Sequence, residues 1–161
     1  MSRFAQHTEV SVEKSRVEIE KLITRYGATS TAFMSAPGRA IIVFEAKERR
    51  IMFELPLPRQ DEKRFTHARV GRGDDLRPRS AEKAMASWEQ ACRQSWRALA
   101  LVIKAKLEAV EAGITTFEDE FLAHIVMPDG ATVSSHIRPR IDAIYQSGSM
   151  QPLLPAPKAT Q

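Results

Sequence analysis

The sequence predicts an α+β fold in which an N-terminal helix is followed by a three-stranded antiparallel meander, one long amphipathic helix and two short C-terminal helices. Three observations support this prediction. Apolar residues recur at steps of three and four in residues 12–26, and again over a much longer stretch, residues 80–113. Between these stretches, three short runs are rich in β-branched and aromatic residues and are separated by turn-forming residues.

Size and composition indicate one domain with a buried core. The chain has 161 residues, of which 43% are hydrophobic and 27% are charged. We expect the domain to span residues 11–156, with a basic linker at residues 59–79 and frayed ends at residues 1–10 and 157–161. The single cysteine excludes an internal disulfide and a cysteine-based zinc site. No apolar run approaches the roughly 20 residues of a membrane span, so we expect a soluble, cytoplasmic protein.

The first helix and the sheet are defined by the residues at their ends. Ser11 is the expected N-cap of the first helix, and Gly27 is expected to close it. The strands are expected at residues 29–36, 40–46 and 50–57. Apolar residues on alternate positions of these strands give the sheet one strongly apolar face. The amphipathic helices that precede and follow the sheet are the candidates to cover that face.

The long helix, residues 80–113, carries both tryptophans and the only cysteine. Its apolar positions advance by close to 3.6 residues on average: Ala81, Met85, Trp88, Cys92, Trp96, Leu99, Ile103, Leu107 and Val110. Because Trp88, Cys92 and Trp96 lie within this stripe, we interpret them as core residues rather than base-stacking or nucleophilic groups. A helix of this length is a rod of roughly 50 Å, longer than a three-stranded sheet covers. We expect the C-terminal segment or a second copy of the protein to cover the remainder.

Two shorter helices are expected after the long one. Thr115 opens a capping box for a helix within residues 115–126. A second helix is expected over residues 134–146, with Gly148 as its C-terminal cap. Pro139 is compatible with that helix only if it lies in the first turn, because a proline farther along removes a helical hydrogen bond.

The basic residues suggest a surface for nucleic acid. The formal net charge is +4, and the excess of Lys and Arg over Asp and Glu is largest within residues 59–79. On the long helix, three basic residues fall within about 40° of one another, on an exposed shoulder beside the apolar stripe. Together the two groups form a candidate phosphate-binding surface. The candidate binding residues are Arg64, Arg69, Arg72, Arg77, Arg79, Arg93, Arg97 and Lys104.

Both groups have a simpler interpretation. The composition of residues 59–79 is more typical of a disordered tether than of a binding element. The shoulder of the long helix is equally typical of a solvated face that Glu89, Glu108 and Glu111 partly neutralise. The sequence leaves these alternatives open.

One short motif suggests an enzyme. Glu45-Ala46-Lys47, at a strand end and behind a helix that bears Glu18 and Glu20, is similar to the E-x-K element of restriction-like nucleases, whose carboxylates hold Mg²⁺. The preceding expected strand supplies no Asp, so this site is incomplete. The four histidines have no ligand-like spacing, and no phosphate-binding loop or nucleophile motif occurs. We expect no enzymatic activity, metal or cofactor, and we keep a degenerate or metal-dependent nuclease as a remote alternative.

The run WEQACRQSWRALALVIKAKLEAVEAGITTFEDEFLAHIVMPDG and the later MQPLLP resemble a family of small uncharacterised proteins from bacteriophage and prophage genomes. The resemblance covers roughly residues 11–156 and implies expression inside a bacterial host cell. The family has no assigned activity, so it brings no catalytic residues. The order of helix, three strands and helix also resembles the double-stranded-RNA-binding fold in topology. Only Lys83 stands where that fold has a basic cluster, so no RNA-binding residues are carried over.

We therefore expect a phage or prophage accessory protein that binds nucleic acid, with single-stranded DNA as one candidate, through the basic linker and the helix shoulder. The competing hypothesis is a protein-interaction module that inhibits or recruits a host defence or replication factor. A homodimer is compatible with both hypotheses.

Overall fold

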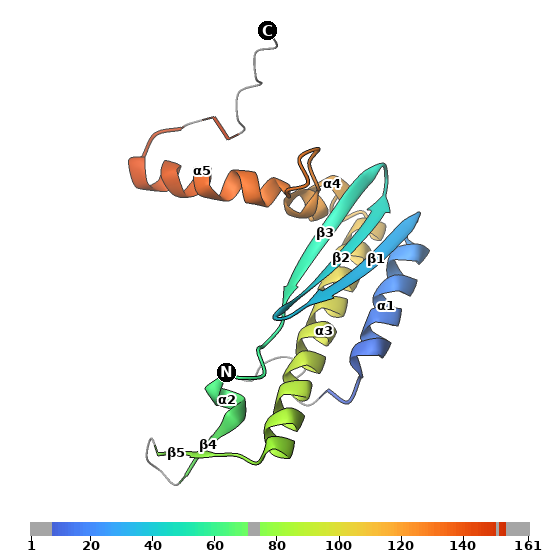
Figure 1. Ribbon diagram of the computed structural model, residues 1–161. Helices are drawn as coiled ribbons and strands as arrows, with labels where there is room; N and C mark the ends of the chain where they lie inside the picture. Colours follow the sequence, from blue (N-terminus) through green and yellow to red (C-terminus); the bar gives the residue numbers. More distant parts are fainter. Residues whose placement is uncertain (1–7, 71–74, 151, 154–161) are drawn as a thin grey trace.

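The computed structural model describes residues 8–70, 75–150 and 152–153, and it has the α+β architecture that the sequence predicts. Figure 1 shows a long central helix with a small sheet and a parallel helix along one half of it, and further elements at both of its ends. The elements in chain order are α1 (Val12–Arg25), β1 (Ser30–Ala36), β2 (Arg39–Ala46), β3 (Arg49–Pro56), α2 (Lys63–Thr66), β4 (His67–Arg69), β5 (Leu76–Pro78), α3 (Ala81–Glu111), α4 (Phe117–Phe121), the 3₁₀ turn η1 (Leu122–His124) and α5 (Val133–Ser147).

The main sheet is an antiparallel meander in the order β1-β2-β3. Alternate residues of β2 are buried, because successive side chains point to opposite faces of a strand. Helices α1 and α3 cover the buried face, and their apolar side chains share one core with the sheet. Among the core residues are Ile19 and Ile23 from α1, Ile42, Phe44, Ile51 and Phe53 from the sheet, and Trp96, Ile103 and Leu107 from α3. The prediction that the two amphipathic helices cover the apolar face is confirmed.

The helix ends follow the expected capping chemistry. The Ser11 hydroxyl accepts a hydrogen bond from the Lys14 amide at 3.2 Å at the start of α1. Gly27 follows the helix with a φ of 93°, a conformation that strains any residue with a side chain. The Ser80 hydroxyl caps α3 in the same way, at 3.4 Å from the amide nitrogen of Lys83. These caps explain why both helices begin close to the predicted residues.

The described part of the segment between the sheet and α3, residues 57–70 and 75–80, is folded, in contrast to the disordered tether that its composition favours. This part contains α2 and a two-stranded hairpin of β4 and β5. It packs on the N-terminal half of α3, where the side chain of Phe65 is only 5% exposed. The indole Nε1 of Trp88 donates a hydrogen bond to the Pro58 carbonyl at 2.8 Å. This segment, rather than the C-terminal segment or a second copy that the sequence predicts, therefore covers the N-terminal half of α3, while α4 packs against the other end of the helix.

Two predictions about the C-terminal elements need correction. The N-cap of α4 is Thr116, whose hydroxyl accepts from the Asp119 amide, and not Thr115. Pro139 lies in the second turn of α5 rather than the first, because the helix begins at Val133. The helix tolerates this proline because it buries none of its residues, and the Ser135 carbonyl that loses a partner is on an exposed residue that water reaches. The left-handed Gly148 cap is confirmed, with a φ of 67°.

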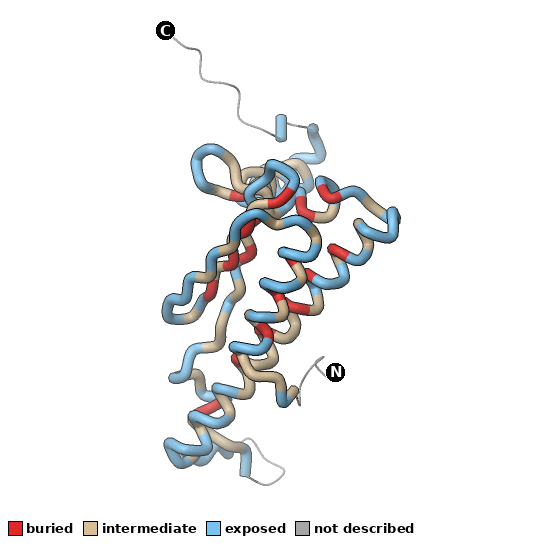
Figure 2. Tube along the Cα trace, turned by 90° about the vertical axis from the view of Figure 1, so that its right-hand side faces the viewer, coloured by how far each residue is buried: buried red, intermediate tan, exposed pale blue. Residues whose placement is uncertain are grey.

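Figure 2 shows that buried residues gather between the sheet and the two long helices. The end formed by α2, β4 and β5 is mostly exposed or half-buried. At the opposite end, α5 extends away from the rest of the chain (Figure 1). No helix within the described residues is long and apolar enough to cross a membrane.

Candidate nucleic-acid interface

Strands β4 and β5 form a small two-stranded sheet at the N-terminal end of α3. Its strands pair in the register His67 with Pro78, Ala68 with Arg77 and Arg69 with Leu76. Beyond the strands, the Val70 amide bonds the Asp75 carbonyl at 2.9 Å, and the Arg79 amide bonds the Thr66 carbonyl at 2.7 Å. These backbone bonds fix the main chain from which the side chains of the hairpin extend.

We call residues 59–70 and 75–83 the basic end of the molecule. These residues include seven Lys or Arg side chains and four carboxylates. Two of the carboxylates already have partners: Arg59 pairs with Asp61 at 2.8 Å, and Arg64 pairs with Glu62 at 2.7 Å. The hydrogen bond from Arg59 holds the pKa of Asp61 below its usual value, so this carboxylate is charged and paired at neutral pH. The basic end keeps a positive excess after these pairs form.

The predicted linker residues lie on the basic end in different settings. Arg77 on β5 and Arg69 on β4 are exposed. Arg79 is half-buried, and its Nη1 donates to the Ser87 hydroxyl of α3 at 2.6 Å. The Arg64 guanidinium lies 4.6 Å from the centre of the Phe65 ring. Arg72 falls outside the described residues.

The predicted shoulder of α3 is not a single exposed surface. Arg97 forms an ion pair with Glu18 of α1 and is only partly exposed. Arg93 donates two hydrogen bonds to the Gln90 side chain, at 2.9 and 2.7 Å. Lys104 is exposed, but it lies about 30 Å along α3 from Lys83 at the basic end. The structure therefore separates Arg97 and Lys104 from the hairpin arginines. Of the predicted linker residues, the four that the structure describes, Arg64, Arg69, Arg77 and Arg79, lie in the segment that precedes α3.

Sequence reasoning missed two members of the basic end. Lys63 begins α2, and Lys83 lies in the first turn of α3. Both are exposed, on the helices that precede and follow the hairpin in the chain. No signal in the sequence identifies them as part of this surface, because local periodicity does not reveal that the segment before α3 folds back onto that helix.

The tryptophans and the cysteine lie as predicted in part. Trp96 is 3% exposed and its ring centre is 6.3 Å from that of Phe33, so it belongs to the core. Trp88 is half-buried and contacts the segment after β3, not the sheet, because the sheet does not reach the N-terminal half of α3. Cys92 is buried, and its burial raises the pKa of the thiol, which disfavours the reactive thiolate.

Glu45 of the E-x-K motif does not meet the carboxylates that α1 carries, Glu18 and Glu20, because α1 lies on the other face of the sheet. Glu45 alternates with the buried Phe44 and Ala46, so it lies on the sheet face away from α1 and α3. There it pairs with Arg50 at 2.8 Å, and the hydrogen bond from Arg50 lowers its pKa. Glu18 is engaged with Arg97 on the other side of the sheet. Within the described part of the chain, no cluster of three metal-binding side chains is formed.

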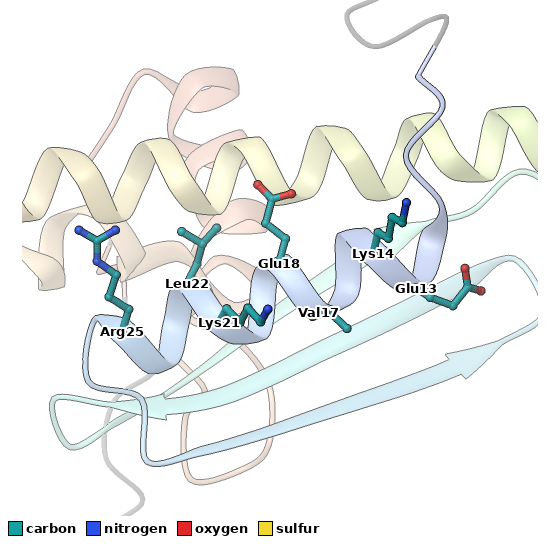
Figure 3. Close-up of a pocket in the computed structure, with 7 residues that line it drawn as sticks. All are labelled: Glu13, Lys14, Val17, Glu18, Lys21, Leu22 and Arg25. Atoms are coloured by element: carbon teal, nitrogen blue, oxygen red, sulfur yellow. The ribbon is translucent and has the colours of Figure 1, made fainter.

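A groove of about 600 Å³ runs along α1, and Figure 3 shows the side chains that line it. Three cations, Lys14, Lys21 and Arg25, alternate there with Glu13 and Glu18 around apolar side chains. Glu18 points toward α3 in this view, consistent with its ion pair to Arg97. The mixed charges give this groove no clear preference for phosphate.

Comparisons with family models, with curated proteins and with solved structures give no match for this chain. The functional argument therefore depends on the geometry and charge of its own residues.

Proposed function

We propose that the protein binds nucleic acid through the basic end. The observation that carries this proposal is the pairing of β4 with β5, whose strands carry the exposed Arg69 and Arg77 at neighbouring positions on opposite faces of the ribbon. The exposed Lys63 and Lys83 lie on the adjoining helices α2 and α3. Cationic side chains on a paired backbone can neutralise phosphates and release the counterions that surround nucleic acid. Lys104 is too distant from the basic end, and Arg97 is already paired with Glu18. We therefore leave both residues out of the proposed contact.

The shape of the basic end favours duplex DNA over single-stranded DNA. A two-stranded ribbon has a cross-section that the major groove of B-form DNA accommodates. Single strands are commonly bound by stacking bases on exposed aromatic rings. The one Phe, Tyr or Trp in the basic end is Phe65, which is buried. We therefore expect contacts with the phosphate backbone rather than base stacking.

A salt titration of binding tests this proposal. Fluorescence polarisation is measured with a labelled 20-base-pair duplex and with a 20-nucleotide single strand, from about 50 to 200 mM salt. We expect the R69A/R77A variant to bind at least about tenfold more weakly than the wild type near 100 mM salt, because each lost phosphate contact changes the dependence of log affinity on log salt by about 0.7–0.9.

The matched control is K14A/K21A, which removes two exposed cations from α1 and lowers the net charge equally. A loss confined to R69A/R77A supports the proposal. Equal losses in the two variants, or no binding to either probe at 50 mM salt, would refute it.

A second candidate function is protein interaction through α5. This helix buries none of its residues, and it exposes Ile141 to 41% and Tyr145 to 86%. A helix of 15 residues is marginal alone in water, so an amphipathic helix that projects from the chain is typical of one that binds a partner.

An I141E/Y145E variant separates the two functions. If α5 binds a partner, this variant loses a specific protein captured by the wild type from bacterial lysate, or loses self-association in sedimentation, and it keeps any DNA binding by the hairpin. Unchanged capture and unchanged sedimentation would exclude α5 as the contact.

A further inference from the structure

A cavity lies between the outer face of β3 and the first two turns of α5, at the opposite end of the molecule from the basic end. Its volume is about 480 Å³, within the roughly 300–1,000 Å³ of small-molecule sites. The polar side chains that line it are Glu54, His124, Thr132, Ser134, Ser135 and Arg138. They come from segments that are far apart in the sequence, so the fold assembles this site.

His124 provides an uncharged hydrogen-bonding group in the wall of the cavity. Its ring stacks on Phe53 with 4.0 Å between ring centres. Burial, helped by the positive charge of Lys106, lowers the pKa of His124, and a hydrogen bond to the Met52 backbone opposes the shift only in part. A neutral imidazole has one donor and one acceptor nitrogen. The uncharged ring of His124 therefore offers one donor and one acceptor nitrogen.

Arg138 provides the cation. It is exposed on the second turn of α5, and within the part of the chain that the structure describes it forms no ion pair or hydrogen bond. By contrast, Glu54 on the opposite wall pairs with Arg39 at 3.4 Å. The carboxylate in the cavity therefore has a cation of its own, and the guanidinium of Arg138 is available to an oxyanion, which it binds in a bidentate manner.

Two hydroxyls are held in place beside Arg138. The Thr132 side chain, on a residue 8% exposed, lies 3.0 Å from the Ser134 hydroxyl and 2.8 Å from that of Ser135. Thr132 also caps α5, which accounts for its own position. The serine hydroxyls are additional polar groups in the cavity wall, and their orientation is fixed by the same contacts.

We propose that this cavity binds a small organic anion. Arg138 contacts the carboxylate or phosphate group, His124 and the serine hydroxyls contact the polar atoms of the ligand, and the Met52 side chain with Pro56 and Pro139 contacts its apolar part. The proposal is independent of nucleic-acid binding, because none of these residues belongs to the basic end.

Histidine resonances report directly on this site. Protein labelled with ¹³C-histidine is titrated with phenyl phosphate, benzoate and inorganic phosphate at constant ionic strength. We expect a saturable shift of the His124 signal with at least one of the two aromatic probes, and the comparison between them shows whether a phosphate or a carboxylate is preferred. A shift no larger than sodium chloride produces, with all three probes, would overturn the proposal.

Three variants test the assignment of residues. R138Q is expected to lower the affinity for the probe about tenfold or more, because it removes the guanidinium. R140Q removes the same charge from the same helix at a residue that bonds the Pro152 carbonyl and does not line the cavity, and it is expected to leave binding unchanged. E54Q is expected to strengthen binding a few-fold, because it removes a negative charge and frees Arg39.

R138Q and E54Q are expected to change the affinity for the probe in opposite directions. The test therefore stays informative if a variant is less stable, because partial unfolding does not increase affinity. Equal weakening by R138Q and R140Q would overturn the proposal. R69A/R77A is expected to bind the probe like the wild type, so failure of the nucleic-acid hypothesis does not affect this result.

Discussion

Arg97 of α3 and Glu18 of α1 form an ion pair that joins the two helices covering the sheet. Their side chains are 25% and 35% exposed, so water screens the pair only in part. We expect R97Q to lower the free energy of unfolding by about 0.5–1 kcal/mol, because it removes a partly buried charge partner. Urea denaturation followed by tryptophan fluorescence measures this change.

The K104Q variant is the control for R97Q, since Lys104 is an exposed cation on the same helix. We expect its free energy of unfolding to stay within about 0.5 kcal/mol of the wild type. A double-mutant cycle with E18Q assigns the energy to the pair. If R97Q weakened DNA binding while leaving stability unchanged, Arg97 would be a binding residue and our interpretation would be wrong.

The hydrogen bond from Trp88 to the Pro58 carbonyl holds the chain that leads into the basic end against α3. W88F keeps an aromatic ring and removes the hydrogen-bond donor, so we expect the free energy of unfolding to fall by about 1 kcal/mol. We expect the effect to be local. Hydrogen exchange should accelerate at the amides of Val70 and Arg79, which bond across the hairpin segment, more than at amides of β2. Uniform acceleration across the chain would show that the hairpin does not unfold as a separate unit.

The main elements of the fold were predictable because each has a local cause. Alternating burial defines β2, and serine and glycine caps define the ends of α1. The hairpin of β4 and β5 was not predictable, because its strands are only three residues long and carry no alternation. Pro139 was misplaced for a related reason: the sequence does not show that α5 stands in water, where a helix tolerates a proline beyond its first turn.

The candidate site was predictable only where neighbours in sequence are neighbours in space. The hairpin arginines were found together because one short segment carries them. Arg97 has the angular position of an exposed residue on α3, but α1 lies beside that position and Glu18 engages it. The cavity with His124 and Arg138 joins β3 to α5, and no periodicity within either element indicates that contact.

Phe121 and Leu122 are adjacent residues with opposite roles. Phe121 is fully buried and lies edge-on to Phe44 and Phe53, at 6.0 and 6.2 Å between ring centres. We expect F121A to lower the free energy of unfolding by about 3–5 kcal/mol through lost burial and the cavity left behind. L122A, at a side chain 50% exposed, is the matched control and should cost much less. Thermal unfolding by circular dichroism compares the two, and similar losses would contradict the packing described for α4.

The depressed pKa of His124 predicts how stability depends on pH. Burial and the nearby Lys106 disfavour the charged ring in the folded state, whereas the unfolded chain takes up a proton near the ordinary histidine value of about 6.5. The unfolded state therefore binds more protons as the pH falls through that value. It follows that this group lowers stability on acidification, until the pH passes below the folded pKa.

We expect the free energy of unfolding of the wild type to decrease between pH 7 and pH 5 more steeply than that of H124F. Phenylalanine keeps a ring against Phe53 but does not titrate, whereas the other three histidines are present in both proteins and their effects cancel in the comparison. Urea unfolding at a series of pH values gives the two slopes. Equal slopes would show that His124 takes up a proton as readily in the folded protein as in the unfolded chain, which its burial beside Lys106 argues against.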